Sequence, residues 1–270
     1  MDNPVVDQVD NQLICHQIRQ NILRVSHHSG HGHIPTCFSI VESLVAVYNE
    51  MRHDSDNPDW NHRDIFILSK GHASLALYCT LAQFGYFSID EVFTFGAHRS
   101  KFGCHPDRLK IPGVEASTGS LGHGISLAVG MALAMKIQKT SRRVFTLIGD
   151  GESNEGTVWE SLLVASDLEL NNLTVLFDFN HSQSRSLQIS NPEEKFHAFG
   201  CDALTVDGHD VQSVIKTIQR PSSQPKVIVT KTRKGNGCST LENNMFEWHR
   251  KSPNEEQLAQ LLTELNQSQS

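Results

Sequence analysis

The sequence predicts an α/β fold, with a parallel sheet covered by helices on both faces. Beyond Arg143, short apolar segments of strand character alternate regularly with segments of helical periodicity. Such alternation is typical of parallel strands joined by crossover helices. No internal repeat and no low-complexity linker interrupts the 270 residues, so we expect a single domain over 1–270 with its core at about 8–265.

The first half of the chain is expected to be mainly helical. Residues 6–26 carry apolar side chains at helical spacing, and 37–51 are expected to form a second, largely buried helix. A short strand at Ile65–Leu68 leads through a glycine turn into a helix that ends near Gly85. Another glycine-rich turn opens an apolar helix within residues 118–138.

The second half is expected to alternate strands and helices. The strands are expected at 143–150, 173–180, 202–208 and 225–232, and the helices at 155–168, 191–199, 210–219 and 253–267. Asp210 is expected to cap the third of these helices, and Pro253 to stand at the start of the last. The polar residues 266–270 are expected to form a disordered tail.

The composition argues against several classes of function. The net charge of −7 speaks against a basic nucleic-acid-binding surface, and no apolar run is long enough to span a bilayer. The N-terminus lacks the basic and apolar segments of a secretory signal, and the six cysteines show no C-x-x-C spacing. We therefore expect a cytoplasmic protein that binds neither nucleic acid nor membrane.

Histidine is unusually frequent, with 15 residues in the chain. The histidines that lie beside or near glycine are His31, His33, His72, His123 and His209. A single histidine is usually a surface residue or a satisfied core group, whereas a set of them in glycine-rich loops favours a polar ligand pocket.

Two side chains with oxygen donors follow successive strands of the expected sheet. Asp150 ends one strand and Asn180 the next, and ligands of open parallel sheets bind at the carboxyl ends of strands. Their hard oxygens suit Mg²⁺, and Ca²⁺ as well, with waters and ligand phosphates completing the shell. Gly149 and Gly151 alone could mark a simple turn, but with Asn180 they favour a site where the backbone approaches a diphosphate.

The motifs resemble those of a known family. Gly-Asp-Gly at 149–151, followed after 28 residues (152–179) by Asn180, resembles the thiamine-diphosphate motif. More narrowly, the chain resembles the N-terminal, diphosphate-binding part of transketolases, particularly those split across two polypeptides. The resemblance runs from SGHGH (29–33) to NNMFEWH (243–249) and includes, in order, RDIFILSKGHASLALY, GCHP, TGSLGHGISLAVGMA, GDGESNEG, VDGHD and KTRKGNG.

The resemblance implies an enzyme that transfers a two-carbon ketol unit from a ketose to an aldose-type acceptor, with thiamine diphosphate and Mg²⁺. The implied metal ligands are Asp150, Asn180 and the backbone carbonyl of Ser182. The implied cofactor-binding residues are His72, Gly119, Ser120, Leu121, Gly149, Gly151, Glu152 and Asn180. The implied catalytic residues are the histidines near substrate oxygens and a glutamate of the interface acid network: His31, His105, His249 and Glu155.

The resemblance also implies a partner. Thiamine diphosphate needs its aminopyrimidine ring held, and in this family the glutamate that does so belongs to a separate pyrimidine-binding domain. No region of this chain matches that domain. The expected partner is a second subunit with the pyrimidine-binding and C-terminal domains, in a heterotetramer with two copies of each chain.

Several positions depart from the family pattern. Lys70 replaces a common asparagine, His123 a common glutamine and Arg250 an expected glycine, and the usual Asp-Gly turn is missing after Asn180. Because His123, Arg185 and Arg250 could line an altered pocket, a specialised pathway is a possible setting. The sequence identifies neither donor nor acceptor, nor whether they are phosphorylated.

Two other functions stay open at this point. The α subunit of a 2-oxo-acid dehydrogenase shares the G-D-G…N spacing and a two-chain architecture, but the histidine-bearing motifs favour transketolase. A non-catalytic regulatory subunit would explain the missing Asp-Gly turn, whereas the joint presence of Asp150, Asn180 and the histidines argues against it. A 1-deoxyxylulose-phosphate synthase fits the motifs and the chain length less well.

Overall fold

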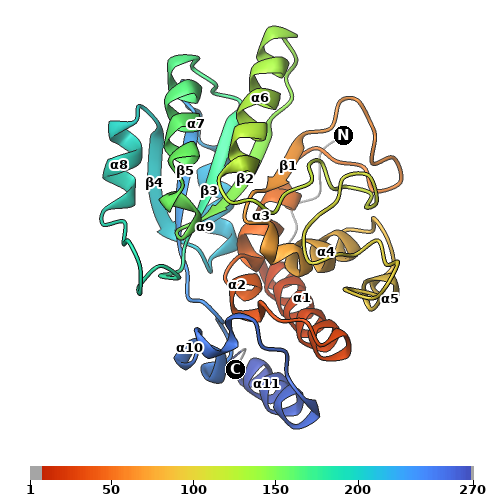
Figure 1. The fold of residues 1–270 in the computed structure, drawn as a ribbon. Coiled ribbons are helices and arrows are strands. Elements are labelled where there is room, and N and C mark those ends of the chain that lie inside the picture. Colours follow the sequence, from red (N-terminus) through yellow and green to blue (C-terminus); the bar gives the residue numbers. More distant parts are fainter. Residues whose placement is uncertain (1–7, 269–270) are drawn as a thin grey trace.

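The sheet expected from the sequence is present. The computed structural model describes residues 8–268, and its strands are β1 (Ile65–Leu68), β2 (Val144–Gly149), β3 (Leu173–Phe179), β4 (Asp202–Asp207) and β5 (Lys226–Lys231). They form one sheet in the order β1-β2-β3-β5-β4, and every neighbouring pair is parallel (Figure 1). The predicted α/β fold class is confirmed.

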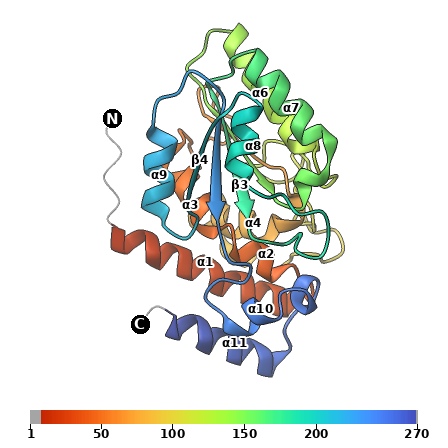
Figure 2. The same ribbon diagram turned by 90° about the vertical axis from the view of Figure 1, so that its left-hand side faces the viewer.

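Helices cover both faces of this sheet (Figure 1). The helices of the described residues are α1 (Gln8–Ser29), α2 (Ile34–Phe38), α3 (Val41–Glu50), α4 (Ser74–Gln83), α5 (Ile89–Val92), α6 (His123–Ile137), α7 (Gly156–Asp167), α8 (Pro192–Ala198), α9 (Val211–Gln219), α10 (Ser239–Asn243) and α11 (Glu255–Gln267). Single 3₁₀ turns lie at Gly71–Ala73, Glu152–Asn154 and Glu247–His249. The last helix, α11, packs along α1 at the end of the molecule away from α6 and α7 (Figure 2).

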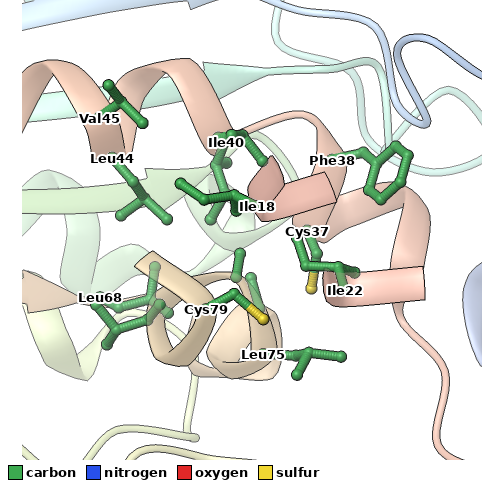
Figure 3. Close-up of a cluster of buried hydrophobic side chains, with 14 of the residues drawn as sticks. Ile18, Ile22, Cys37, Phe38, Ile40, Leu44, Val45, Leu68, Leu75 and Cys79 are labelled. Carbon is green, nitrogen blue, oxygen red and sulfur yellow. The ribbon is translucent and has the colours of Figure 1, made fainter. Parts of the chain in front are cut away.

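Successive side chains of each strand point to opposite faces of the sheet, so the hydrophobic core consists of two clusters. In β2, Phe145 and Leu147 join the cluster formed with α1, α3, α4 and α9, whereas Val144 and Ile148 join the one formed with α6, α7 and α8. Figure 3 shows part of the first cluster, to which α1 contributes Ile18, α3 contributes Leu44 and α4 contributes Leu75. Each such aliphatic side chain contributes about 1.5–3 kcal/mol on burial, so both faces hold the sheet in place.

The structure corrects the expected helices at two points. Residues 37–51 are not one helix, because α2 ends at Phe38 and α3 begins at Val41. The break lies at Ile40, whose φ of −109° and ψ of 2° leave the helical range. Next to it, the hydroxyl of the buried Ser39 donates to the carboxylate of Asp178 over 2.8 Å. The last helix begins after Asn254, which forms a capping box with Gln257, so Pro253 lies before the helix and not at its first turn.

Other expectations about the helices fare differently. Asp210 caps α9 as expected, since its carboxylate accepts from the backbone N–H of Gln212 over 3.0 Å. The disordered tail expected at 266–270 is wrong for its first two residues, because α11 continues to Gln267. Residues 269–270 lie outside the described part of the chain. Within residues 8–268, no helix is both long and apolar enough to cross a membrane.

Candidate active site

The two expected metal ligands lie at the same edge of the sheet. In the register of β2 and β3, Gly149 stands opposite Asp178, and the backbone N–H of Asp150 donates to the Asp178 carbonyl over 3.1 Å. Asp150 and Asn180 therefore follow neighbouring strands at their carboxyl ends, where open parallel sheets bind their ligands.

The Asp150 carboxylate is buried with one oxygen unpaired. Its Oδ1 accepts from the backbone N–H of Gly151 over 2.7 Å, while Oδ2 has no hydrogen-bond partner in the described structure. Burial, with the nearby Asp178 carboxylate, raises the pKa of Asp150 to about 6. A buried acceptor without a partner is costly, so this oxygen fits a cation that would complete its coordination.

A second buried carboxylate orients the amide of Asn180. Asp178 accepts from the Lys70 ammonium over 2.6 Å, from Ser39 over 2.8 Å and from the Thr232 hydroxyl over 2.5 Å. The Asn180 amide nitrogen donates to the same carboxylate over 2.7 Å. This fixes the amide plane, and the Asn180 oxygen, the atom that would bind a metal, accepts from the backbone N–H of Ser182 over 2.9 Å.

Two lysines that were not expected as site residues supply positive charge. Lys70 is buried against Asp178, and Lys234 donates to the Ser182 hydroxyl over 2.7 Å. Burial, with the charge of Lys70, lowers the pKa of Lys234 to about 8. Both lie in motifs noted from the sequence, SKGH and TRKG, but only the fold shows that they are buried beside Asp150. Together they make this edge of the sheet suitable for an anion.

Three histidines gather beside Lys234. The ring centroid of His33 lies 5.8 Å from that of His72 and 5.4 Å from that of His249. The Lys234 ammonium is 3.3 Å from Nδ1 of His249, an arrangement in which the charged lysine donates and His249 carries its proton on Nε2. Burial, with the charge of Lys70, lowers the pKa of His72 to about 2, so that imidazole is neutral at physiological pH.

The other two expected catalytic histidines lie on neighbouring loops. His31 is half-buried, with Nδ1 3.7 Å from the Cys104 sulfur, and its ring edge fits against Gly96, where the backbone has a φ of 72°. The exposed His105 lies against Gly119, since a Cβ at that glycine would stand 3.3 Å from the imidazole. His105 thus touches the loop expected to lie against the cofactor.

Glu152 connects three segments at this edge of the sheet. Its buried carboxylate accepts from the Ser69 hydroxyl, from the backbone N–H of Gly122 over 2.9 Å and from that of Gly149 over 3.1 Å. These three partners belong to the loops after β1, before α6 and at the end of β2. Glycine is required where the loops meet, because a Cβ at Gly124 would lie 2.5 Å from Cα of Ser69. The structure therefore gives Glu152 a positioning role.

The remaining expected site residues are exposed or half-exposed. Ser120 and Leu121 lie on the loop before α6, and Glu155 is the exposed residue before α7. A Cβ at Gly151 would meet nothing within 4 Å, which leaves open space beside this turn, although its N–H is already donated to Asp150. Of the positions that depart from the family pattern, Arg250 lies at the histidine cluster, since its carbonyl group packs against Gly32 next to His33. Arg185 lies over the ring of Phe246, and His123 is exposed at the start of α6.

Comparison with known proteins matches the chain to one family. The thiamine diphosphate-binding domain of transketolase matches residues 10–268.

The chain belongs to the transketolase family.

Two relatives of similar length are named as transketolase subunits. One subunit of the apulose-4-phosphate transketolase of Actinobacillus succinogenes is 38% identical over 245 residues, 87% of each chain. A 6-deoxy-6-sulfo-D-fructose transketolase subunit of a Clostridium species is 37% identical over 88% of this chain and 90% of that one. The solved transketolase of Leishmania mexicana matches with a TM-score of 0.87 and 28% identity, over 95% of this chain but only 41% of its own length.

These matches confirm the expected family, fold and class of enzyme. The chain is of the transketolase type and corresponds to the thiamine diphosphate-binding part, which its relatives of similar length carry as a separate subunit. It spans about two fifths of the solved transketolase. Neither the 2-oxo-acid dehydrogenase nor the regulatory alternative is favoured by these relatives.

Proposed function

We propose that this chain is the N-terminal subunit of a two-chain transketolase that moves a ketol unit from a ketose to an aldose-type acceptor. The observation that carries the proposal is the unpaired buried oxygen of Asp150, at the same sheet edge as Asn180 and within reach of the charges of Lys70 and Lys234. A divalent cation and a diphosphate together match this combination of oxygen donors and positive charge. The metal would be Mg²⁺, and Ca²⁺ suits the same ligands.

Each group of residues has a separate task in this proposal. Asp150, Asn180 and the carbonyl of Ser182 would hold the metal, while Lys234 would balance part of the diphosphate charge and Lys70 would balance that of Asp178. The loop Gly119–Leu121, together with Gly149, Gly151 and His72, would line the cofactor, and Glu152 would hold that loop in position. Thiamine diphosphate, when bound, supplies a carbon nucleophile and an electron sink.

The remaining histidines would act on the substrate. His31, His105 and His249 would hold or move protons at substrate oxygens, as imidazoles do in general acid–base catalysis. Glu155 is exposed before α7, which suits a role in an acidic network completed by another subunit.

We further propose the setting of the enzyme. A second chain with pyrimidine-binding and C-terminal domains would complete each site, in a cytoplasmic heterotetramer with two copies of each chain, and residues 1–270 would act as one domain. The relatives' names include a phosphorylated and a sulfonated sugar, so ketoses with a terminal anionic group are the first substrates to test.

The test is ketol transfer by the assembled complex with Mg²⁺ and thiamine diphosphate, over a panel of phosphorylated, sulfonated and unmodified ketoses. We expect transfer from at least one ketose, and none from 2-oxo acids of the dehydrogenase type. Asp150→Ala should abolish metal-dependent cofactor binding and turnover, whereas the exposed Asp167→Ala in α7 should change neither. Unchanged turnover in Asp150→Ala would refute the assignment.

A further inference from the structure

His209 lies in the turn after β4 and uses both of its ring nitrogens within the protein. The backbone N–H of Arg233 donates to Nε2 over 2.8 Å, and Nδ1 lies 3.3 Å from the carboxylate of Glu42. Because Nε2 accepts, the proton of the neutral ring belongs on Nδ1, which donates to Glu42. This histidine, unlike the pocket residue expected from its glycine-rich motif, is therefore occupied by groups of the chain itself.

The carboxylate beside His209 is itself held in place. Glu42, in the first turn of α3, accepts from the guanidinium of Arg19 over 2.7 Å, and both side chains are buried. Arg19 also donates to the carbonyl of Phe38 over 2.8 Å. A carboxylate paired with a buried guanidinium stays ionised, so Glu42 favours the tautomer of His209 that carries its proton on Nδ1.

His209 continues the sheet beyond its last paired strand residues. The register of β4 and β5 ends with Asp207 opposite Lys231, whose carbonyl accepts from the backbone N–H of Gly208 over 2.8 Å. Backbone groups alternate between the two sides of a strand, so the next N–H that points towards β4 is that of Arg233. The imidazole accepts this N–H where a strand would offer a carbonyl.

The residue after Arg233 is Lys234, whose ammonium lies in the proposed anion site. On its other side, the backbone N–H of Gly235 donates to the Pro35 carbonyl over 3.0 Å. The backbone is thus fixed both before and after Lys234, by the imidazole of His209 and by a backbone carbonyl. Because the side chain of Lys234 is buried, its ammonium can reach the site only if this backbone keeps its position.

We propose that His209 is a positioning residue, which holds the segment 233–235 so that Lys234 meets the diphosphate of the cofactor. This inference rests on the proposed function and deepens it, since it gives a task to a histidine whose ring nitrogens are both occupied by the protein. The imidazole serves in one tautomer only, because a proton on Nε2 would face the N–H of Arg233. Arg19 and Glu42 set that tautomer from the opposite side of the ring.

Three variants separate this role from simple packing. His209→Leu fills the space of the ring without an acceptor. His209→Gln carries an amide oxygen and an amide N–H that can replace Nε2 and Nδ1, so it is the conservative variant. His197→Leu in α8 is the matched control, because the ring of His197 also contacts a backbone group, the carbonyl of Cys201, over 3.2 Å.

The experiment is a fluorescence titration of the assembled complex with thiamine diphosphate and Mg²⁺, in the wild-type and the Lys234→Met backgrounds. We expect His209→Leu to weaken binding about fivefold in the wild type, as the loss of one hydrogen bond predicts, and by less than about twofold in Lys234→Met. His209→Gln should restore most of the affinity, and His197→Leu should not change it. Without cofactor, the amide of Arg233 should exchange its hydrogen at least about tenfold faster in His209→Leu.

Each outcome decides the question. An equal loss of affinity in both backgrounds would indicate a general structural role and overturn the inference, as would unchanged affinity in His209→Leu or no recovery in His209→Gln. If His209→Leu does not assemble, His209→Asn, whose side chain is too short to reach both partners, takes its place in the same cycle. A wild-type complex that binds the cofactor but transfers no ketol unit would refute the proposed function alone, whereas one that binds no cofactor would refute both.

Discussion

The close contact between α6 and the loop after β1 gives the sharpest test of how the site is built. Gly124→Ala would place a Cβ 2.5 Å from Cα and 2.6 Å from Oγ of Ser69. That hydroxyl donates to Glu152 and accepts from the backbone N–H of Ile125 over 3.1 Å, so both hydrogen bonds would be disturbed. Steric repacking costs about 1–3 kcal/mol and each weakened buried hydrogen bond about 1 kcal/mol, which gives a loss of about 3–5 kcal/mol.

Gly130→Ala, in the same helix, is the matched control. A Cβ at Gly130 meets nothing within 4 Å, so alanine should raise the free energy of unfolding by about 0.5–1 kcal/mol through helix propensity. With an unfolding entropy of about 2 cal/mol/K per residue, Tm should fall by about 5–9 °C in Gly124→Ala and rise by about 1–2 °C in Gly130→Ala. Calorimetry on the two full-length variants would refute the packing argument if their Tm values agreed within about 1 °C.

Three further results are expected. Lys234→Met should weaken binding of thiamine diphosphate with Mg²⁺ by about tenfold in a fluorescence titration of the complex, whereas the exposed Lys231→Met should not; equal affinities would remove Lys234 from the anion site. Burial alone would raise the pKa of Glu42, but the charge of Arg19 and a hydrogen bond from His209 outweigh burial and lower that pKa to about 2. The ionised Glu42 therefore stabilises the folded state fully above pH 4.5, and this contribution is lost as the pH falls towards 2. A urea midpoint that does not change between about pH 5 and about pH 3 would contradict this. Because the raised pKa of Asp150 is about 6, Mg²⁺ affinity should fall as the pH drops below that value, and calorimetric titrations that show constant affinity would argue against Asp150 as a ligand.

The strands and the metal edge could be predicted because their signals are local. Apolar β-branched runs mark β2 and β3, and the position of Asp150 and Asn180 at their ends follows from the parallel arrangement. The break between α2 and α3 lies at Ile40, whose backbone angles leave the helical range although the apolar pattern continues across it. The neighbouring Ser39 contacts Asp178, which is 139 residues away along the chain, and a contact of this kind gives no signal in the local sequence.

The contacts of the site residues could not be predicted from the sequence either. Lys70 was visible as a departure from the family pattern, but its burial against Asp178 depends on strands that are far apart in the sequence. Glu152 was expected at the cofactor, yet its three partners are groups of the protein itself. His33 was noted as one histidine of a glycine-rich loop, and its left-handed backbone is a property that only the fold reveals.

The central claim is that this chain carries half of a cofactor site that a second chain completes. The most direct measurement is affinity purification of the tagged chain from its native cells with thiamine diphosphate and Mg²⁺ present, followed by mass spectrometry. We predict a stoichiometric second polypeptide with a pyrimidine-binding domain. Recovery of the chain alone, or with an unrelated protein, would contradict the claim.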